Sequence, residues 1–172
     1  MRFHYCPKCG EALSFRDLGD DKDVPWCGRC SRPWFDMFSS CVIVLVHNER
    51  NEVMLLEQQY ISSQYRNLVS GYIQPGETAE EAACREVLEE TGITISQLEF
   101  AGTYWFAKKG MMMIGFIASA EAGDDAPRLS SEVDGAGWFD AAEAPGLVHP
   151  KGSVSHTLCD LFLNNTKKHS SS

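Results

Sequence analysis

The sequence lacks any apolar run approaching the roughly 20 residues that a membrane-spanning helix needs, and its first residues lack the apolar stretch of a signal peptide. It is also poor in basic residues, because 15 Lys and Arg stand against 24 Asp and Glu, giving a net charge of -9. Such a surface repels an extended phosphate backbone, which makes polymeric nucleic acid a poor first expectation. We therefore expect a soluble, cytoplasmic protein with no membrane partner.

Internal repeats and a candidate Ser-His pair for nucleophilic catalysis are absent as well. The 172 residues suffice for one core of typical domain size and at most one small appended module. Sustained hydrophobic periodicity begins only at Cys41, which places a module boundary near Ser39. We expect an N-terminal module and linker over residues 1–38, a main domain over 39–166 and a disordered tail over 167–172.

Seven cysteines in a chain without a secretory signal favour metal binding or free thiols over a disulfide framework. Four of them form the paired motifs CPKC and CGRC, namely Cys6, Cys9, Cys27 and Cys30. This spacing is typical of a tetrahedral four-thiolate zinc site, whereas a redox pair usually needs only one such motif. Four protein ligands leave no position for water, so we expect one structural zinc per chain. Docking of nucleic acid or protein by this ribbon remains an alternative role. The other cysteines are expected to be small core residues, namely Cys41, Cys84 and Cys159.

The main domain reads as a mixed α/β sandwich. Strands are expected at Cys41–Val46 and Val53–Glu57 around a polar turn, then at Leu98–Phe106, Met111–Ser119 and Ala136–Phe139. Between them, Thr78 to Glu90 predicts a helix that starts with a Thr78–Glu81 capping box and stops at Gly92. A last helix is expected from about Ser153 to Asn164, with Val154, Leu158, Leu161 and Phe162 on one apolar face.

The central predicted helix carries three carboxylates on one face, because Glu86, Glu89 and Glu90 are spaced i, i+3 and i+4. Their mutual repulsion would be relieved by a divalent ion such as magnesium, which takes oxygen ligands from carboxylates, phosphates and water. A solvated acidic face is the plainer alternative. A loop shaped by Gly71 and Gly76 precedes the helix. Arg85 is also placed to hold Glu77 by a charged hydrogen bond.

The segment from Gly71 to Ile93 resembles the complete motif of the Nudix hydrolases. Its matching positions are Gly71, Glu77, Arg85, Glu86, Val87, Glu89, Glu90, Gly92 and Ile93. The resemblance implies a Nudix α/β/α sandwich that hydrolyses a nucleoside diphosphate linked to another moiety. It also implies that Glu86 and Glu90 bind catalytic magnesium or manganese, and that Glu89 is a metal ligand or the base that activates water. Arg85 and Glu77 would orient the loop and the helix.

A four-cysteine ribbon before a Nudix domain resembles the NADH pyrophosphatases, and the resemblance covers Tyr5 to about Phe162. It implies that Phe35 stacks on the substrate's base and that Glu132 is a fourth metal-binding carboxylate. It further implies that the Ser70 carbonyl faces metal and that Ser155 lines the substrate pocket. Exposed apolar linker residues such as Trp34 and Phe38 would suit a homodimer.

Two departures from that subfamily bear on the substrate. Its NADH signature segment is replaced here by TYWFAKKG, from Thr103 to Gly110, and the ribbon begins at Cys6 without the domain that precedes it in those enzymes. In the replacement, Trp105 and its aromatic neighbours can stack on a base while Lys108 and Lys109 meet a phosphate. Packing of a strand end is an equally good interpretation.

The leading functional hypothesis is a metal-dependent pyrophosphatase acting on a dinucleotide such as NADH, NAD, ADP-ribose or FAD, with release of mononucleotides. Removal of NAD-type caps from RNA is a close alternative, although the acidic balance counts against it. A non-catalytic module that binds a nucleotide and docks a partner is a third hypothesis, against which the full set of glutamates weighs.

Overall fold

The computed structural model describes residues 2–121, 127–131 and 133–169. Contacts divide the chain into two compact units, Met1–Ser39 and Ser40–Ser172, and each is described by itself. None of the helices in these residues is both long enough and apolar enough to cross a membrane.

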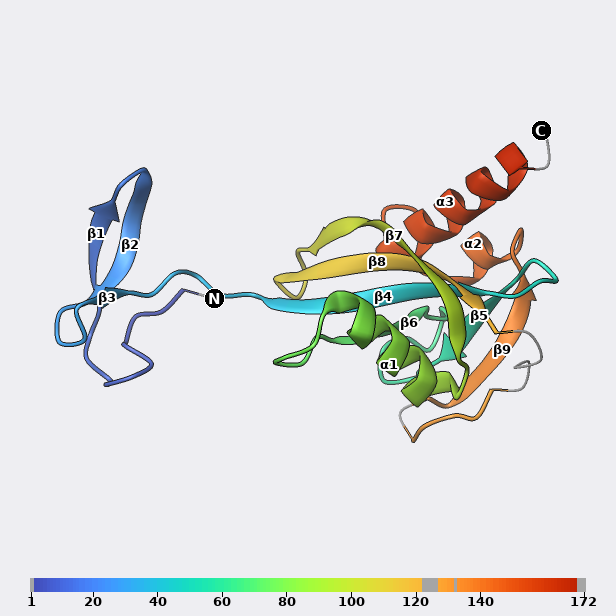
Figure 1. Ribbon diagram of the computed structural model, residues 1–172, viewed down its shortest axis with the longest axis horizontal. Coiled ribbons are helices and arrows are strands. Elements are labelled where there is room, and N and C mark those ends of the chain that lie inside the picture. The colour runs from blue at the N-terminus through green and yellow to red at the C-terminus, as the bar shows by residue number, and fades with distance from the viewer. Residues whose placement is uncertain (1, 122–126, 132, 170–172) are drawn as a thin grey trace. The chain divides into compact units, whose positions relative to one another are not determined.

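The first unit contains a small antiparallel sheet in the order β1-β2-β3, formed by Ser14–Leu18, Asp21–Cys27 and Arg32–Pro33 (Figure 1). Its main buried cluster contains Cys6, Leu13 and Cys27, with Phe3, Cys9, Cys30 and Trp34 packed against them. Cysteines therefore make up much of this core. The sequence did not predict these strands, because charged residues and turns mask any period-two alternation.

The second unit is built on a mixed sheet with strands in the order β7-β8-β4-β5-β9, and β6 pairs with β4 (Figure 1). Its elements are β4 (Ser39–His47), β5 (Glu52–Glu57), β6 (Val69–Tyr72), α1 (Ala79–Thr91), β7 (Ile95–Phe106), β8 (Met111–Ala120), β9 (Gly135–Asp140), α2 (Ala144–Leu147) and α3 (Val154–His169). The predicted α/β fold class is confirmed, as are the β4–β5 hairpin and the central helix.

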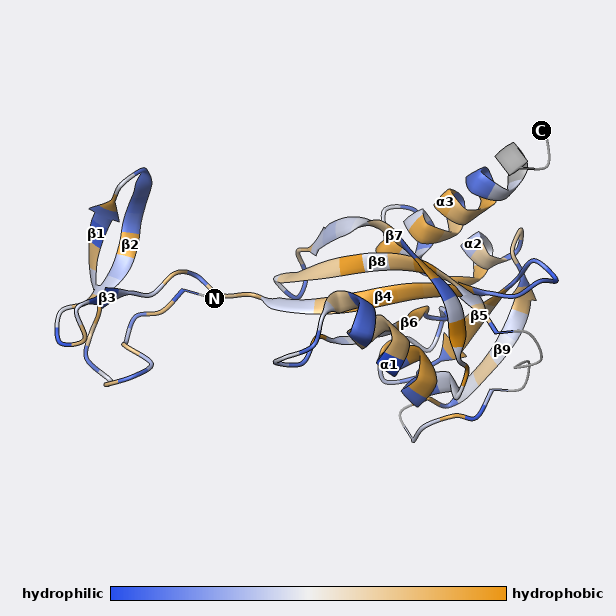
Figure 2. Ribbon diagram, in the orientation of Figure 1, coloured by the Kyte–Doolittle hydropathy of each residue, from blue (hydrophilic) through white to orange (hydrophobic). Residues whose placement is uncertain are grey.

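Strand β4 lies at the centre of this sheet and is buried on both faces, which explains its almost unbroken apolar run. Val42, Val44 and Val46 belong to a cluster that includes Ala82, Ala83 and Val87 of α1. The alternating residues Ile43 and Leu45 belong to a second cluster that includes Leu158, Cys159 and Phe162 of α3. Because successive strand residues point to opposite faces, α1 and α3 cover opposite sides of the sheet. Figure 2 shows the apolar colouring concentrated along β4 and β8 between them.

The loop expected to include Gly71 is shorter than predicted, because Gly71 lies inside strand β6, where it pairs with Val42. Four residues with a glycine among them carry too weak a pattern to predict as a strand. The short helix α2 was also not predicted. Strand β6 pairs with β4, and α2 packs against α3.

Two expectations for α3 and the cysteines need correction. Leu161 is exposed, whereas Leu158 and Phe162 of the same predicted apolar face are buried and Val154 is partly buried. Cys84 is exposed on α1, whereas Cys41 and Cys159 are buried as expected. Helix α3 extends to His169, three residues into the segment expected to be a disordered tail, and residues 170–172 lie outside the described residues.

Candidate functional site

Helix α1 is fixed at both ends by local hydrogen bonds. The Thr78 N–H donates to Glu81 Oε2 at 2.7 Å, and the Glu81 N–H donates to Thr78 Oγ1 at 3.2 Å, which completes a capping box. At the other end Gly92 adopts φ 69° and its N–H donates to the Leu88 carbonyl. These caps fix where the helix begins and ends, while packing of Ala82, Ala83 and Val87 into the core sets which face carries the glutamates.

Arg85 links several parts of this site. Its Nε and Nη2 donate to the two carboxylate oxygens of Glu77 at 3.0 and 2.7 Å, and Nη2 also donates to the Tyr72 carbonyl at 3.1 Å. Its Nη1 donates to Glu86 Oε1 at 2.7 Å and to Glu89 Oε2 at 3.0 Å. These bonds lower the pKa of Glu77 and raise that of Arg85. Arg85 therefore ties the helix to the loop before it and braces two further carboxylates.

Glu86 lies directly over the backbone of Gly71. A Cβ atom built on Gly71 would come within 1.9 Å of the Glu86 carboxylate carbon, so no other residue fits there without displacing that side chain. The Glu86 side chain is 13% exposed, whereas that of Glu89 is 57% exposed. Close approach of helix and strand at a glycine thus places Glu86 in a defined, largely buried position.

We expect Gly71→Ala to displace Glu86 and to lower hydrolytic activity by about 100-fold, the loss that a misplacement of roughly 1 Å can cause. Overpacking should also destabilise the fold by about 1–3 kcal/mol. Steady-state kinetics and thermal unfolding measure the two effects. Gly146→Ala is the matched control, because a Cβ there meets nothing within 4 Å. Unchanged kinetics in the Gly71 variant would contradict this role of Glu86.

Glu90 is the most buried of the three helix glutamates, with 5% of its surface exposed. Its Oε1 accepts a hydrogen bond from Gln58 Nε2 at 3.0 Å, and its Oε2 accepts from the Ser70 N–H at 3.4 Å. The sequence predicted that the Ser70 carbonyl faces metal, and the structure places the Ser70 amide against Glu90. Gln58 was not predicted, because nothing in its spacing marks it.

The donor set on α1 suits a hard divalent cation, since it offers carboxylate oxygens from one helix face and leaves other positions to phosphate and water. Arg85 Nη1 bridges Glu86 and Glu89, so a cation there would share these oxygens with the guanidinium. Among the described residues, the group whose potential metal-ligand atoms all lie close together is the set of four cysteines in the first unit. The α1 glutamates supply carboxylate oxygens of the kind that such a cation prefers.

The four cysteines of the first unit converge, with all Sγ atoms within 4.8 Å of one another. Cys6 and Cys30 have their sulfurs 3.9 Å apart, and those of Cys9 and Cys27 are 3.6 Å apart. Tetrahedral zinc with bonds of about 2.3 Å requires sulfurs about 3.8 Å apart, so this geometry fits the ion. The Cys30 N–H also donates to Cys27 Sγ at 3.2 Å, and Gly10 supplies a turn at φ 76°. These cysteines can hold zinc.

The remaining predicted substrate residues lie on different elements of the chain. Phe35 lies in the first unit and is 55% exposed, and Trp105 at the end of β7 is 56% exposed. Ser155 is buried in the first turn of α3, on the side of the sheet opposite α1. Glu132 lies outside the described residues. Trp34, expected to be exposed, is partly buried against the cysteine core.

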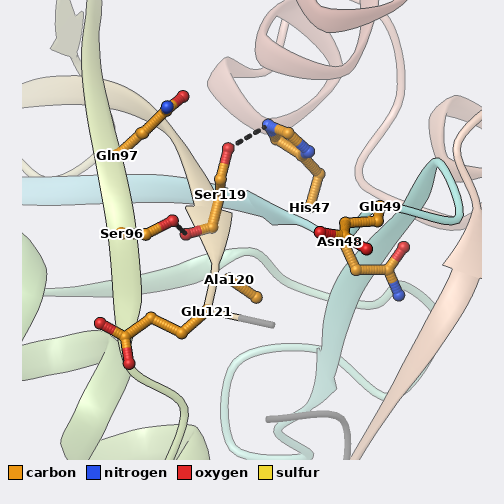
Figure 3. Close-up of a pocket in the computed structure, with 8 residues that line it drawn as sticks. All are labelled: His47, Asn48, Glu49, Ser96, Gln97, Ser119, Ala120 and Glu121. Carbon is orange, nitrogen blue, oxygen red and sulfur yellow. Dashed lines mark hydrogen bonds between the residues drawn. The ribbon is translucent and has the colours of Figure 1, made fainter. Parts of the chain in front are cut away.

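A polar hollow lies apart from these carboxylates. It is lined by His47, Asn48, Glu49, Ser96, Gln97, Ser119, Ala120 and Glu121 (Figure 3). Ser119 and His47 are joined by a hydrogen bond of 3.1 Å, and burial lowers the pKa of His47. None of the α1 glutamates lines it, so the hollow is not the candidate catalytic site.

The mixed sheet between helices and the motif carried from Gly71 to Ile93 define a Nudix-type α/β protein. The model of the NUDIX domain family matches residues 37–158, and the chain belongs to this family. The recognition of a Nudix hydrolase from sequence is thereby confirmed. Membership of the zinc-ribbon NADH pyrophosphatases stays a prediction.

The chain is similar to proteins named NAD-capped RNA hydrolase NudC. It is 32% identical over 167 residues to the protein of Photobacterium profundum, which covers 96% of this chain and 60% of that protein. It is 31% identical over 168 residues to the protein of Vibrio atlanticus, covering 98% and 60%. The chain thus spans about three fifths of the length of these relatives.

Solved structures show the same fold. A NUDIX hydrolase from Nitrosomonas europaea has a TM-score of 0.71 at 19% identity, with 96% of this chain and 93% of that chain covered. A C. elegans Ap4A hydrolase has a TM-score of 0.61 at 21% identity, with 76% and 98% covered. At these identities the likeness establishes the fold alone.

Proposed function

We propose that this chain is a Nudix pyrophosphatase that hydrolyses the diphosphate bond of a dinucleotide-type substrate of the NADH/NAD, ADP-ribose or FAD class, releasing mononucleotides. The observation that carries the proposal is the set of glutamates on α1. Arg85 donates hydrogen bonds to Glu86 and Glu89, and Glu86 lies against Gly71. The family, the fold and the relatives named as hydrolases of NAD-capped RNA support it.

The residues proposed to hold the catalytic magnesium or manganese are Glu86 and Glu90, together with Glu132 and the Ser70 carbonyl. Such ions neutralise phosphate charge and lower the pKa of bound water. Glu89 is the proposed base, since its side chain is 57% exposed and within reach of solvent. Arg85 and Glu77 position the helix and its preceding loop through their paired hydrogen bonds. This chain's own contribution is orientation and proton acceptance.

Cys6, Cys9, Cys27 and Cys30 are proposed to bind one structural zinc. Four thiolates close the coordination sphere, so this ion supplies folding energy and takes no part in hydrolysis. Phe35, Trp105 and Ser155 are proposed to contact the substrate, and the exposure of both aromatic rings is compatible with stacking on a base. A homodimer is proposed from the exposed apolar side chains of the first unit.

RNA carrying an NAD-type cap is the second candidate substrate, because the relatives' names specify it. The net charge of -9 weighs against strong binding of the RNA body, so we place free dinucleotides first. The same diphosphate chemistry serves both substrates. A catalytically silent nucleotide-binding module is a third candidate.

The test is mononucleotide release from NADH, NAD, ADP-ribose, FAD, diadenosine polyphosphates, nucleoside triphosphates and an NAD-capped RNA, with magnesium or manganese. We expect a dinucleotide to be cleaved with the highest kcat/KM. Preference for capped RNA that falls steeply with salt would favour the second candidate. Nucleotide binding without cleavage of any compound would favour the silent module and overturn the enzyme proposal.

A further inference from the structure

We propose that Gln58 is a positioning residue for Glu90, an assignment that rests on the proposed function. Gln58 follows directly after β5 and is 1% exposed, although it carries a polar amide. Its Nε2 donates to Glu90 Oε1 at 3.0 Å, a contact between residues 32 positions apart in sequence. Its second nearby partner is the Tyr60 hydroxyl at 3.5 Å. Gln58 thus brings a buried hydrogen-bond donor to a buried carboxylate.

The orientation of the Gln58 amide follows from its partner. An ionised carboxylate only accepts hydrogen bonds, so the NH₂ group must face Glu90 and the amide oxygen must face away. With the Ser70 N–H on Oε2, both oxygens of Glu90 then contact donors. Two donors on separate oxygens fix the plane of the carboxylate as well as its position. Glu90 is therefore oriented before any cation binds.

The backbone around Gln58 is held on both sides. Its carbonyl accepts hydrogen bonds from the N–H groups of Ile61 and Ser62 at 2.9 and 3.0 Å. Its neighbours Glu57 and Gln59 both bond to Asp134, at 2.8 and 2.7 Å. These four hydrogen bonds hold the backbone that carries the Gln58 side chain. A supported backbone suits a residue that orients another group.

Stability alone does not account for a glutamine at this position. Its Oε1 is buried and has no hydrogen-bond partner among the described residues. A buried amide oxygen without a partner is unfavourable, so an apolar residue of similar size would pack here at a lower cost. The amide is therefore better explained by its hydrogen bonds than by packing, and its closer partner is Glu90.

The glutamates differ in the charge of the side chain that donates a hydrogen bond to them. Glu77, Glu86 and Glu89 accept from the cationic Arg85, whereas Gln58 is neutral. A neutral donor stabilises the ionised carboxylate without cancelling its charge. Glu90 thereby keeps its attraction for a divalent cation. Outer hydrogen-bond partners of this type typically contribute about 10- to 100-fold to metal affinity.

The test compares Gln58→Met with Gln59→Met by titrating manganese into the substrate-free protein, with calorimetry or electron paramagnetic resonance as readout. Gln59 is the matched control, because it is an exposed neighbour whose hydrogen bond to Asp134 uses its backbone. We expect manganese affinity to fall by about 10- to 100-fold in Gln58→Met and to stay unchanged in Gln59→Met. Activity at saturating manganese should recover at least in part, which separates positioning from loss of fold.

A second measurement needs no variant and holds even if Gln58→Met fails to fold. In the parent protein, diamagnetic magnesium should shift the side-chain amide resonances of Gln58 and leave those of Gln59 in place. Equal manganese affinity in folded Gln58→Met and parent, or magnesium binding that leaves the Gln58 amide unmoved, would overturn this assignment while the hydrolase proposal stands. A parent protein that neither binds manganese nor cleaves any dinucleotide would overturn both.

Discussion

Replacing Glu86 by glutamine is expected to lower the hydrolysis of NADH by at least about 100-fold, more than loss of an outer hydrogen-bond partner typically costs. The substitution keeps the shape of the side chain over Gly71 and exchanges an anionic oxygen for an amide, which is a poor magnesium ligand. Only 13% of the side chain is exposed, so solvent does not compensate for the loss of the carboxylate charge. Steady-state kinetics at several magnesium concentrations measure the effect.

Glu80→Gln is the matched control, because Glu80 is exposed in the first turn of the same helix. It removes the same charge at a distance from Arg85 and should leave the kinetics near those of the parent. Full activity in Glu86→Gln, or an equal loss in Glu80→Gln, would remove the basis for assigning metal to this helix face.

The second large effect concerns the cysteine cluster. Removing zinc, by a strong chelator or by Cys27→Ser, is expected to unfold the first unit and leave the second unit folded. The buried cluster of the first unit consists of Cys6, Leu13 and Cys27, and it is too small to hold a fold without metal. Structural zinc contributes about 10–16 kcal/mol in comparable peptides. Hydrogen exchange should show β1 and β2 losing protection while β4 and β5 keep theirs.

Zinc content by elemental analysis is the companion measurement, with one ion per chain expected in the parent and none in Cys27→Ser. Cys84→Ser is the matched control, since Cys84 is an exposed cysteine of the second unit. Its zinc content should equal that of the parent. Protection of β1 and β2 that survives complete zinc removal would show that the ion is not structural.

Features coded by adjacent residues were predictable from sequence. Helix α1 has its start signal at Thr78 and Glu81 and its stop signal at Gly92, and all three act through local hydrogen bonds. The contact of Arg85 with Glu77 is also present. Both residues lie within one motif, Glu77 in the loop before the helix and Arg85 on the helix itself.

Features that depend on the folded sheet were not predictable. The contact of Gln58 with Glu90 joins the end of β5 to the end of α1, and neither spacing nor residue type predicts it. Gly71 weakens the strand pattern around it and so predicts a loop, yet a glycine is needed in β6 so that Glu86 can approach. The prediction that Leu161 faces the core is wrong, because Leu161 lies at the edge of a helix face whose other predicted members Leu158 and Phe162 are buried.

The most direct test of the proposed function is product analysis after incubation of NADH with the purified chain. The proposal predicts AMP and reduced nicotinamide mononucleotide in equal amounts, formed only when magnesium or manganese is present and abolished by chelator. The Glu86→Gln variant should yield neither product at a comparable rate. Product formation that chelator leaves unchanged, or folded protein that cleaves none of the diphosphate compounds, would contradict the assignment of this chain as a metal-dependent pyrophosphatase.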